Sequence, residues 1–321
     1  MVLSNNYTIF GIQDNAERYF WAAYNFFVVL SSFIGDSLIL YASFQRDAFK
    51  IHKFVVTVMQ YIAVFDLASA STTSLPGGIT LFANTWILGD AMCNALAYLA
   101  SYFYSVGICL IAVMTSGKFL QIKYPLRSTA LTKRMAHKIC ISIVITYLVA
   151  QFICLMVDKD DIELDYRVYS CQYMYTHDIW KTLLPIMITI MMLIPNIVIV
   201  ATTVPILVIA RRYARRFGES IHWQGALPLA LTAVVYCIST LPLFVYFIGS
   251  KFVLDSKFKI EYYRISAYLA TINIMSNFYI YALTINSFRG FLLFKIVSFT
   301  NLFRNMTTST GEIIIELLGW L

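Results

Sequence analysis

Long apolar runs alternate with short polar connections along this chain. Seven runs stand out, near 19–44, 54–83, 91–117, 137–157, 179–210, 226–249 and 262–286. A run of about 20 apolar residues can cross a bilayer as a helix, and inside lipid only helices or closed barrels satisfy their own backbone hydrogen bonds. Because these runs are too long for barrel strands, we expect an all-α membrane protein built as a seven-transmembrane helix bundle.

The composition supports this class. Of the 321 residues, 60% are hydrophobic and only 13% are charged, whereas about a quarter of a soluble domain is charged. No repeat, low-complexity tract or linker marks off a second domain, so we expect one membrane domain over 19–286, with an N-terminal segment, 1–18, and a tail, 287–321. The first segment lacks the basic start and the cleavage site of a signal peptide, so the first run should remain in the mature protein.

Basic residues indicate the orientation in the membrane. If the N-terminus is outside, 16 of the 24 Lys and Arg lie on the cytoplasmic side and 11 of the 17 acidic residues lie outside. Short cytoplasmic loops are enriched in Lys and Arg. We therefore expect a multi-pass protein of the plasma membrane with an extracellular N-terminus. The net basicity belongs to that cytoplasmic face, so nucleic-acid binding, which needs a soluble basic surface, is not expected.

Two cysteines are expected on the outer side of the membrane. Cys93 lies at the outer end of the third run and Cys171 in the longest outer connection. That side is oxidising, so we expect a disulfide between them. Asn6 begins an Asn-Tyr-Thr sequon on the same side and is a candidate glycosylation site.

Several landmarks follow one another in a recognisable order. They are "FDLA" (65–68), "NTWILGDAMC" (84–93), Pro195 and Pro242 within two later runs, "NFYIY" (277–281) and "SFRGFLL" (287–293). In this order and topology they resemble the rhodopsin-like G-protein-coupled receptors over nearly the whole chain. The resemblance implies an extracellular ligand, a heterotrimeric G protein as cytoplasmic partner, and a short amphipathic eighth helix after residue 286.

Other functional classes fit the sequence less well. The four histidines are scattered and form no His-Glu-x-x-His motif, so an enzyme is not expected. A transporter commonly has inverted halves and interrupted helices, which seven unequal runs do not offer. The alternative that stays open is a seven-span ligand-gated channel or a chemoreceptor that works without a G protein. The ligand itself is expected to be a short peptide or a small apolar, chemosensory molecule.

The stretch "MTSGKFLQIKYPLR" (114–127) departs from the family pattern. Counting back from its Pro-Leu pair, Gly117, Lys118 and Phe119 stand where the family has Asp-Arg-Tyr. The resemblance implies an activation switch made of these three residues with Pro242 and Tyr281. The acid that restrains the family's Arg at rest is missing, and Lys lacks the planar fork of Arg. The alternative is that Lys118 is one more interfacial basic residue.

Polar side chains lie in the middle of three runs. Asp36 and Asp66 are mid-span carboxylates, while Asn273 and Asn277 are four residues apart and share one helix face. An ionisable residue at this depth normally faces the bundle interior with a partner. The resemblance implies a sodium ion held by such oxygen ligands, and Asp36 adds a second charge. No other cofactor is expected. The alternative is a hydrated polar plug that only packs the helices.

Aromatic residues dominate the outer half of the runs. The resemblance points five of them inward as a ligand pocket, with Glu261 and Arg264 at its rim: Tyr104, Phe244, Phe247, Tyr263 and Tyr268. Aromatic walls with a few polar groups suit small apolar molecules or short peptides, although aromatic residues also simply fill helix bundles. Ala100 stands where amine receptors carry Asp, and Thr271 where opsins carry the retinal lysine, so neither ligand class is expected.

Overall fold

The computed structural model describes residues 14–45, 48–126, 130–157, 162–165, 170–173, 180–217, 221–249, 256–295 and 297–298. Nearly all of them are helical. The elements are α1 (Asn15–Ser43), α2 (Lys53–Ser69), a π-helical turn (Ala70–Ser74), α3 (Leu75–Ala83), α4 (Asp90–Lys123), α5 (Lys133–Val157), β1 (Ile162–Asp165), β2 (Ser170–Tyr173), α6 (Trp180–Phe217), α7 (Ile221–Gly249) and α8 (Ser256–Thr284).

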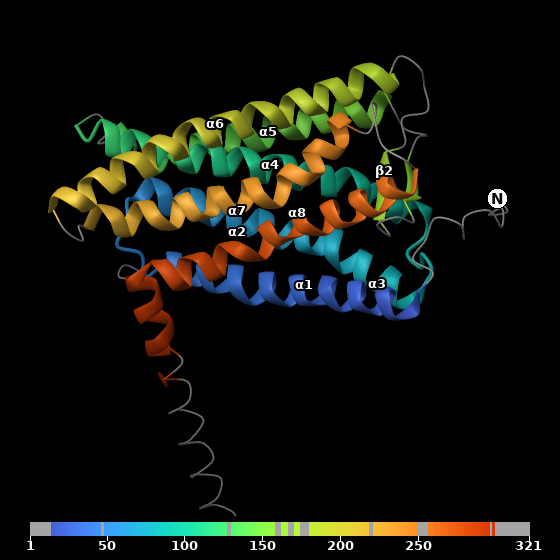
Figure 1. Cartoon of the computed structure of the whole chain (residues 1–321), viewed down its shortest axis with the longest axis horizontal. Coiled ribbons are helices and arrows are strands. Elements are labelled where there is room, and N and C mark those ends of the chain that lie inside the picture. The colour runs from blue at the N-terminus through green and yellow to red at the C-terminus, as the bar shows by residue number, and fades with distance from the viewer. Residues whose placement is uncertain are drawn as a thin grey trace, which may run out of the picture.

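The long helices lie side by side along the long axis of the molecule (Figure 1). Helix α4 has a central position, because it packs against α2, α5, α6 and α7. Its residues Val106, Leu110 and Met114 are completely buried in the main hydrophobic core. The start of α1 and the strands lie at one end, which we call the disulfide end (Figure 1). The opposite end, where α2 begins at Lys53, is called the His52 end.

Four helical segments are long and apolar enough to cross a membrane by length and composition: Asn15–Ser43, Lys53–Ala83, Asp90–Lys123 and Lys133–Ile153. On α5, the apolar side chains of Ile141, Ile145, Leu148 and Phe152 are about half exposed and recur every three or four residues. Such a stripe on the outside of a bundle suits contact with lipid. The chain is therefore an all-α, multi-pass membrane protein, as its sequence predicts.

A π-helical turn interrupts the second predicted run. Over Ala70–Ser74 the backbone adopts the wider turn, and the amide of Leu75 bonds to the carbonyl of Ala70. The hydroxyls of residues 71, 72 and 73 donate to backbone carbonyls one turn earlier. Pro76, which has no amide hydrogen, is the second residue of α3. Hydroxyls that bond back to the helix and proline both loosen the regular ladder. The run 54–83 is thus two helices, α2 and α3, joined by an irregular turn.

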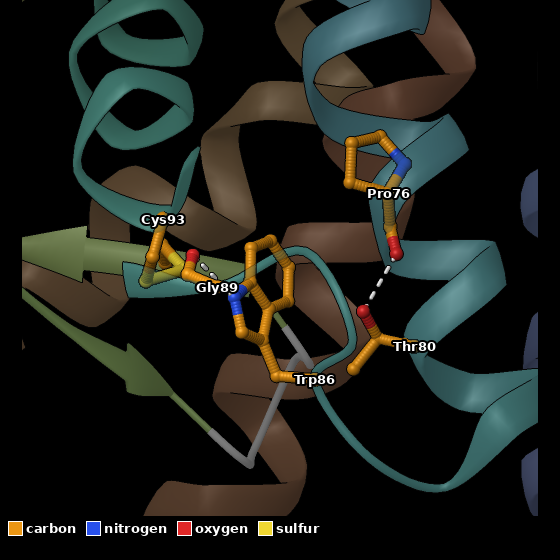
Figure 2. Close-up of a disulfide and its surroundings, with 6 residues drawn as sticks. Pro76, Thr80, Trp86, Gly89 and Cys93 are labelled. Atoms are coloured by element: carbon orange, nitrogen blue, oxygen red, sulfur yellow. Dashed lines mark hydrogen bonds between the residues drawn. A yellow bond between two sulfur atoms is a disulfide. The ribbon is translucent and has the colours of Figure 1, made fainter. Parts of the chain in front are cut away.

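The disulfide end is fixed by a covalent link and a short loop. Cys93 in the first turn of α4 is bonded to Cys171 of β2, so the predicted pairing is confirmed. Strand β2 pairs antiparallel with β1. Before α4, the indole nitrogen of Trp86 donates to the carbonyl of Gly89 at 2.9 Å (Figure 2). Gly89 has φ +79°, a conformation that glycine adopts without strain. The Trp-x-x-Gly spacing therefore shapes the entry into α4.

A further helix follows α8 over residues 286–295, and we call it the C-terminal helix. It turns away from the bundle axis at the His52 end (Figure 1). Phe288 is completely buried and its ring stacks on Phe49 at 4.8 Å, whereas Arg289 is exposed. The Ser287 hydroxyl accepts a bond from the amide of Lys50 at 3.3 Å. One side of the C-terminal helix is thus anchored to the connection between α1 and α2.

Candidate functional site

The polar residues of the middle of the bundle form what we call the polar core: Asp36 of α1, Asp66 of α2, and Asn273 and Asn277 of α8. All four are at most 8% exposed. The Asn277 amide nitrogen donates to Asp66 Oδ2 at 2.7 Å, which joins α2 to α8. Within α1, the Ser32 hydroxyl donates to Asp36. Ser32 was not predicted from the sequence, although its position one turn before Asp36 is a usable signal.

Three oxygen atoms of the polar core face no donor among the described residues. They are Oδ1 of Asp36, Oδ1 of Asn273 and Oδ1 of Asn277. The charge of Asp36 also acts on Asp66. A buried acceptor without a donor is costly, and carboxylate and amide oxygens are the ligands that hard cations prefer. The described residues contain no group of three or more His, Cys, Asp or Glu fit for a metal ion, so a cation here would depend on the two asparagines.

The position of the missing acid is occupied by a ring. Gly117 of α4 is buried, and a Cβ built on it would overlap the ring of Phe54, the second residue of α2. Phe54 is itself only 2% exposed and belongs to the main core. A side chain at Gly117 and the Phe54 ring therefore exclude each other. An acid at this position would require the Phe54 ring to move, or α2 to lie farther from α4.

Lys118 lies at the His52 end of α4 and is partly buried. Among the described residues, no carboxylate forms an ion pair with Lys118. The ion pairs of those residues involve Arg264, at the other end of the bundle. The positive charge of Lys118 acts on His52, the residue before α2. The next residue, Phe119, packs on Ile206 of α6 and lies under the Lys123 ammonium, 5.2 Å from the ring centre.

Two other predicted switch residues lie on different helices. Tyr281 of α8 is 1% exposed, and its hydroxyl reaches Met114 Sδ of α4 at 3.8 Å, one turn before Lys118. Pro242 lies inside α7 and is partly buried. The structure thus brings Tyr281 near the Lys118 turn, while Pro242 belongs to another helix.

A second close contact lies where α1 meets α8. Gly35 of α1 leaves no room for a Cβ beside Phe278 of α8. Phe278 stands in the "NFYIY" motif at the position where the family has proline. The departure from the family pattern at this position therefore coincides with a tight packing contact between two helices.

An ionic and aromatic cluster lies at the disulfide end between α1 and α8. Arg264 is 3% exposed and pairs with Glu17 at 3.2 Å and also with Glu261. The Trp21 indole donates to Glu17 at 3.1 Å and stacks on the Tyr268 ring at 4.2 Å. Arg264, predicted at a pocket rim, thus has a buried guanidinium that is paired with Glu17 of α1 and with Glu261 of its own helix. Glu17 and Trp21 were not predicted as its partners, although they are one turn apart.

The predicted ligand-pocket residues do not all share one environment. Tyr268 packs against α1, whereas Tyr263 is buried with its ring 4.7 Å from Tyr246 of α7. Tyr104 of α4 is partly buried. The side chains of Phe244 and Phe247 lie outside the described residues, as does Asn6. Tyr104, Tyr263 and Tyr268 all remain predicted pocket residues, and the Tyr268 ring also connects α8 to α1 through Trp21.

The fold and the motifs define a membrane receptor, and a family comparison agrees. The model of the 7 transmembrane receptor (rhodopsin family) matches residues 37–281. This covers most of the chain, from the residue after Asp36 to Tyr281. The chain belongs to the 7 transmembrane receptor (rhodopsin family), as its motifs predict. No curated protein matches the chain in a sequence search.

Proposed function

We propose that this chain is a plasma-membrane receptor that binds an extracellular ligand and signals to a heterotrimeric G protein. Seven helices cross the membrane in this proposal, with the N-terminus and the disulfide end outside. The four apolar segments described above are the first four spans, and α6, α7 and α8 are the other three. The C-terminal helix lies along the inner leaflet, which its partly buried face and its turn away from the bundle axis support (Figure 1).

The observation that carries the proposal is the bond between Asp66 and Asn277. It joins α2 to α8 in the buried centre, and both residues belong to family motifs within the matched range. A hydrogen bond between buried side chains is electrostatically stronger in a low-dielectric interior than in water. A bundle joined in this way can hold one helix arrangement at rest and release another when a ligand binds. The chain belongs to a family of receptors, not of enzymes, and a change between two helix arrangements fits the role of a receptor.

The polar core is proposed to hold a sodium ion in the resting arrangement. Its unpaired acceptor oxygens come from α1 and α8 and lie with a carboxylate of α2. A cation among them would satisfy acceptors that no donor of the described residues reaches, and would tie the three helices together. Asp36 would contribute charge to the site and help to hold the ion.

The ligand is proposed to be a short peptide or a small apolar, chemosensory molecule. Tyr104 near the middle of α4 and Tyr263 near the start of α8 supply aromatic rings in the outer half of the bundle. Ala100 offers no carboxylate to an amine, and Thr271 offers no amine to retinal; its hydroxyl instead lies 3.0 Å from the Tyr24 hydroxyl of α1. Amine and retinal recognition therefore lack their chemical partners.

A ligand screen in cells that express a promiscuous G protein tests the proposal. Peptide and odorant collections are applied, and calcium release is read beside cells that express the Asp66→Ala variant at equal surface amount. A response that disappears when the G protein is blocked supports the proposal. A ligand-gated current that survives the block would instead establish the channel alternative, which the family match does not favour.

A further inference from the structure

A cavity of about 470 Å³ lies at the His52 end, between the starts of α2 and α5. Its wall combines cationic, polar and apolar side chains from two segments far apart in the sequence. The lining residues are Ile51, His52, Lys53, Leu131, Thr132 and Lys133. None of them belongs to the polar core, to the switch residues or to the aromatic pocket.

The cavity carries an excess of positive charge. Lys53 and Lys133 are exposed, and each is the first residue of its helix. The first turns of α2 and α5 contain no acidic residue. Within the described ranges, neither lysine pairs with a carboxylate, and Asp47 of the nearby connection lies outside those ranges. The arrangement places two ammonium groups on one opening.

Helix geometry strengthens the positive field. Both helices begin at the His52 end and pack against each other in parallel, with the Tyr61 hydroxyl 3.1 Å from His137 Nδ1 across the contact. Each helix N-terminus carries roughly half a positive charge. Lysine at a helix N-terminus is unfavourable for the same reason, so two parallel starts with a lysine each are stabilised by an anion.

The caps of both helices are already formed by side chains of the cavity. His52 Nδ1 accepts from the amide of Phe54 at 3.3 Å, and the Thr132 hydroxyl accepts from the amide of Met135 at 3.2 Å. The first amides of a helix otherwise have no intrahelical acceptor. The pKa of His52 is lowered, first by partial burial and then by the charge of Lys118, which agrees with a positive environment.

We propose that this cavity binds the phosphorylated headgroup of an anionic membrane lipid. Phosphate oxygens suit lysine ammonium groups in the positive field of two helix N-termini, and Ile51 and Leu131 line the same cavity with apolar side chains. On the same helix, the exposed apolar stripe of α5 begins at Ile141, about two turns after Lys133, and runs away from the His52 end. A lipid can thus place its headgroup at the lysines and its acyl chains on that stripe, which a soluble phosphate cannot do.

Native mass spectrometry of the full-length receptor tests the site. A short-chain phosphatidylinositol bisphosphate is titrated against the wild type, the Lys53→Gln/Lys133→Gln variant and a matched Lys50→Gln/Lys138→Gln variant. The matched lysines are exposed, belong to the same two segments and do not line the cavity. Each lysine near an anionic headgroup contributes about a fivefold change in affinity, so the cavity variant should bind on the order of 25-fold more weakly.

Two controls distinguish lipid binding at the cavity from misfolding and from binding of a soluble phosphate. Lys53→Arg/Lys133→Arg keeps both charges and should retain binding, which also shows that the segment folds. The free inositol phosphate headgroup should bind more weakly than the lipid. Equal losses in the cavity and matched variants would overturn the proposal, as would a headgroup that binds as tightly as the lipid. The assay reads lipid directly, so its outcome is independent of G-protein signalling.

Discussion

Two glycines make room for phenylalanine rings at helix contacts of this receptor. Gly35 of α1 adjoins Phe278 of α8, and Gly117 of α4 adjoins Phe54 of α2. In each pair one member stands at a position where the sequence departs from the family pattern. The departures are therefore paired with close helix contacts, and a side chain at either glycine requires its partner ring to move or to become smaller.

A first prediction concerns Gly117. Gly117→Ala should destabilise the receptor by about 1–3 kcal/mol, because the added methyl group overlaps the Phe54 ring. Gly107→Ala is the control on the same helix, since a Cβ at that position meets no atom within 4 Å, and it should be neutral or slightly stabilising. Thermal unfolding of the purified proteins measures both. Equal melting temperatures for the two variants would contradict the packing argument.

The same contact decides how the family switch can be restored. Gly117→Asp with Lys118→Arg should fail to reach the surface at normal amounts, whereas the same pair with Phe54→Ala should recover. In the recovered protein the new carboxylate can restrain the arginine, so we expect lower ligand-free nucleotide exchange and a larger response to agonist. Basal exchange equal to that of Phe54→Ala alone, at matched receptor amounts, would show that Lys118 is not the switch.

A further prediction concerns the polar core. Sodium should lower basal nucleotide exchange in the wild type; Asp66→Asn should abolish this dependence, and Asp36→Asn should weaken it. Asp90→Asn, which changes an exposed acid in the first turn of α4, should respond as the wild type does. Exchange is measured in sodium and in an organic cation at equal ionic strength. Identical salt responses in all four proteins would contradict a sodium site and favour the alternative, a hydrated polar plug that only packs the helices.

At the scale of elements, the start of α2 depends on the protonation of one side chain. His52 caps the helix through Nδ1, and only the neutral ring can accept that bond. Its pKa is lowered by burial and by Lys118, so the unfolded chain binds the proton more readily than the folded receptor. By linkage, the contribution of His52 to stability is complete above its ordinary value of 6.5 and is lost as the pH falls below it.

Lowering the pH through that range should therefore reduce the melting temperature of the wild type more than that of His52→Asn. Asparagine caps a helix well and does not titrate in this range. Among the residues that the structure describes, Lys53, Lys118 and Lys133 are charged groups near His52, and lysine stays protonated throughout this range. A parallel pH profile in the two proteins would exclude the His52 cap as the cause.

The helices followed from the sequence because apolar length and the position of basic residues dictate membrane spans. The bounds of α2 with α3 lie within one residue of the predicted run 54–83, whereas α4 ends six residues later and α8 begins six residues earlier than predicted. Packing between helices was not predictable in the same way. The exclusion of a side chain at Gly117 depends on how closely α2 approaches α4, and the burial of Arg264 depends on Glu17 from the far end of the chain.

At the scale of the whole molecule, one covalent bond crosses the disulfide end. Cys93 and Cys171 are 78 residues apart in sequence. A disulfide that closes so long a loop typically contributes about 2–5 kcal/mol. Cys171→Ala should therefore lower the surface amount and the melting temperature, whereas Cys237→Ala removes a free thiol and should change neither by much. Wild-type stability of the Cys171 variant would contradict this role.

The π-helical turn at Ala70–Ser74 has a consequence for counting positions along the chain. It inserts one residue into the helix, and each residue rotates the helix by about 100°. Every side chain beyond Ser74 therefore faces a direction displaced by one position from the phase set at Asp66. If residues of α3 are aligned with a regular helix by counting forward from Asp66, each is assigned a direction that differs by one residue from the direction it has in the structure. Deleting one residue of this turn should restore a single phase and rotate α3 on its contact with α1.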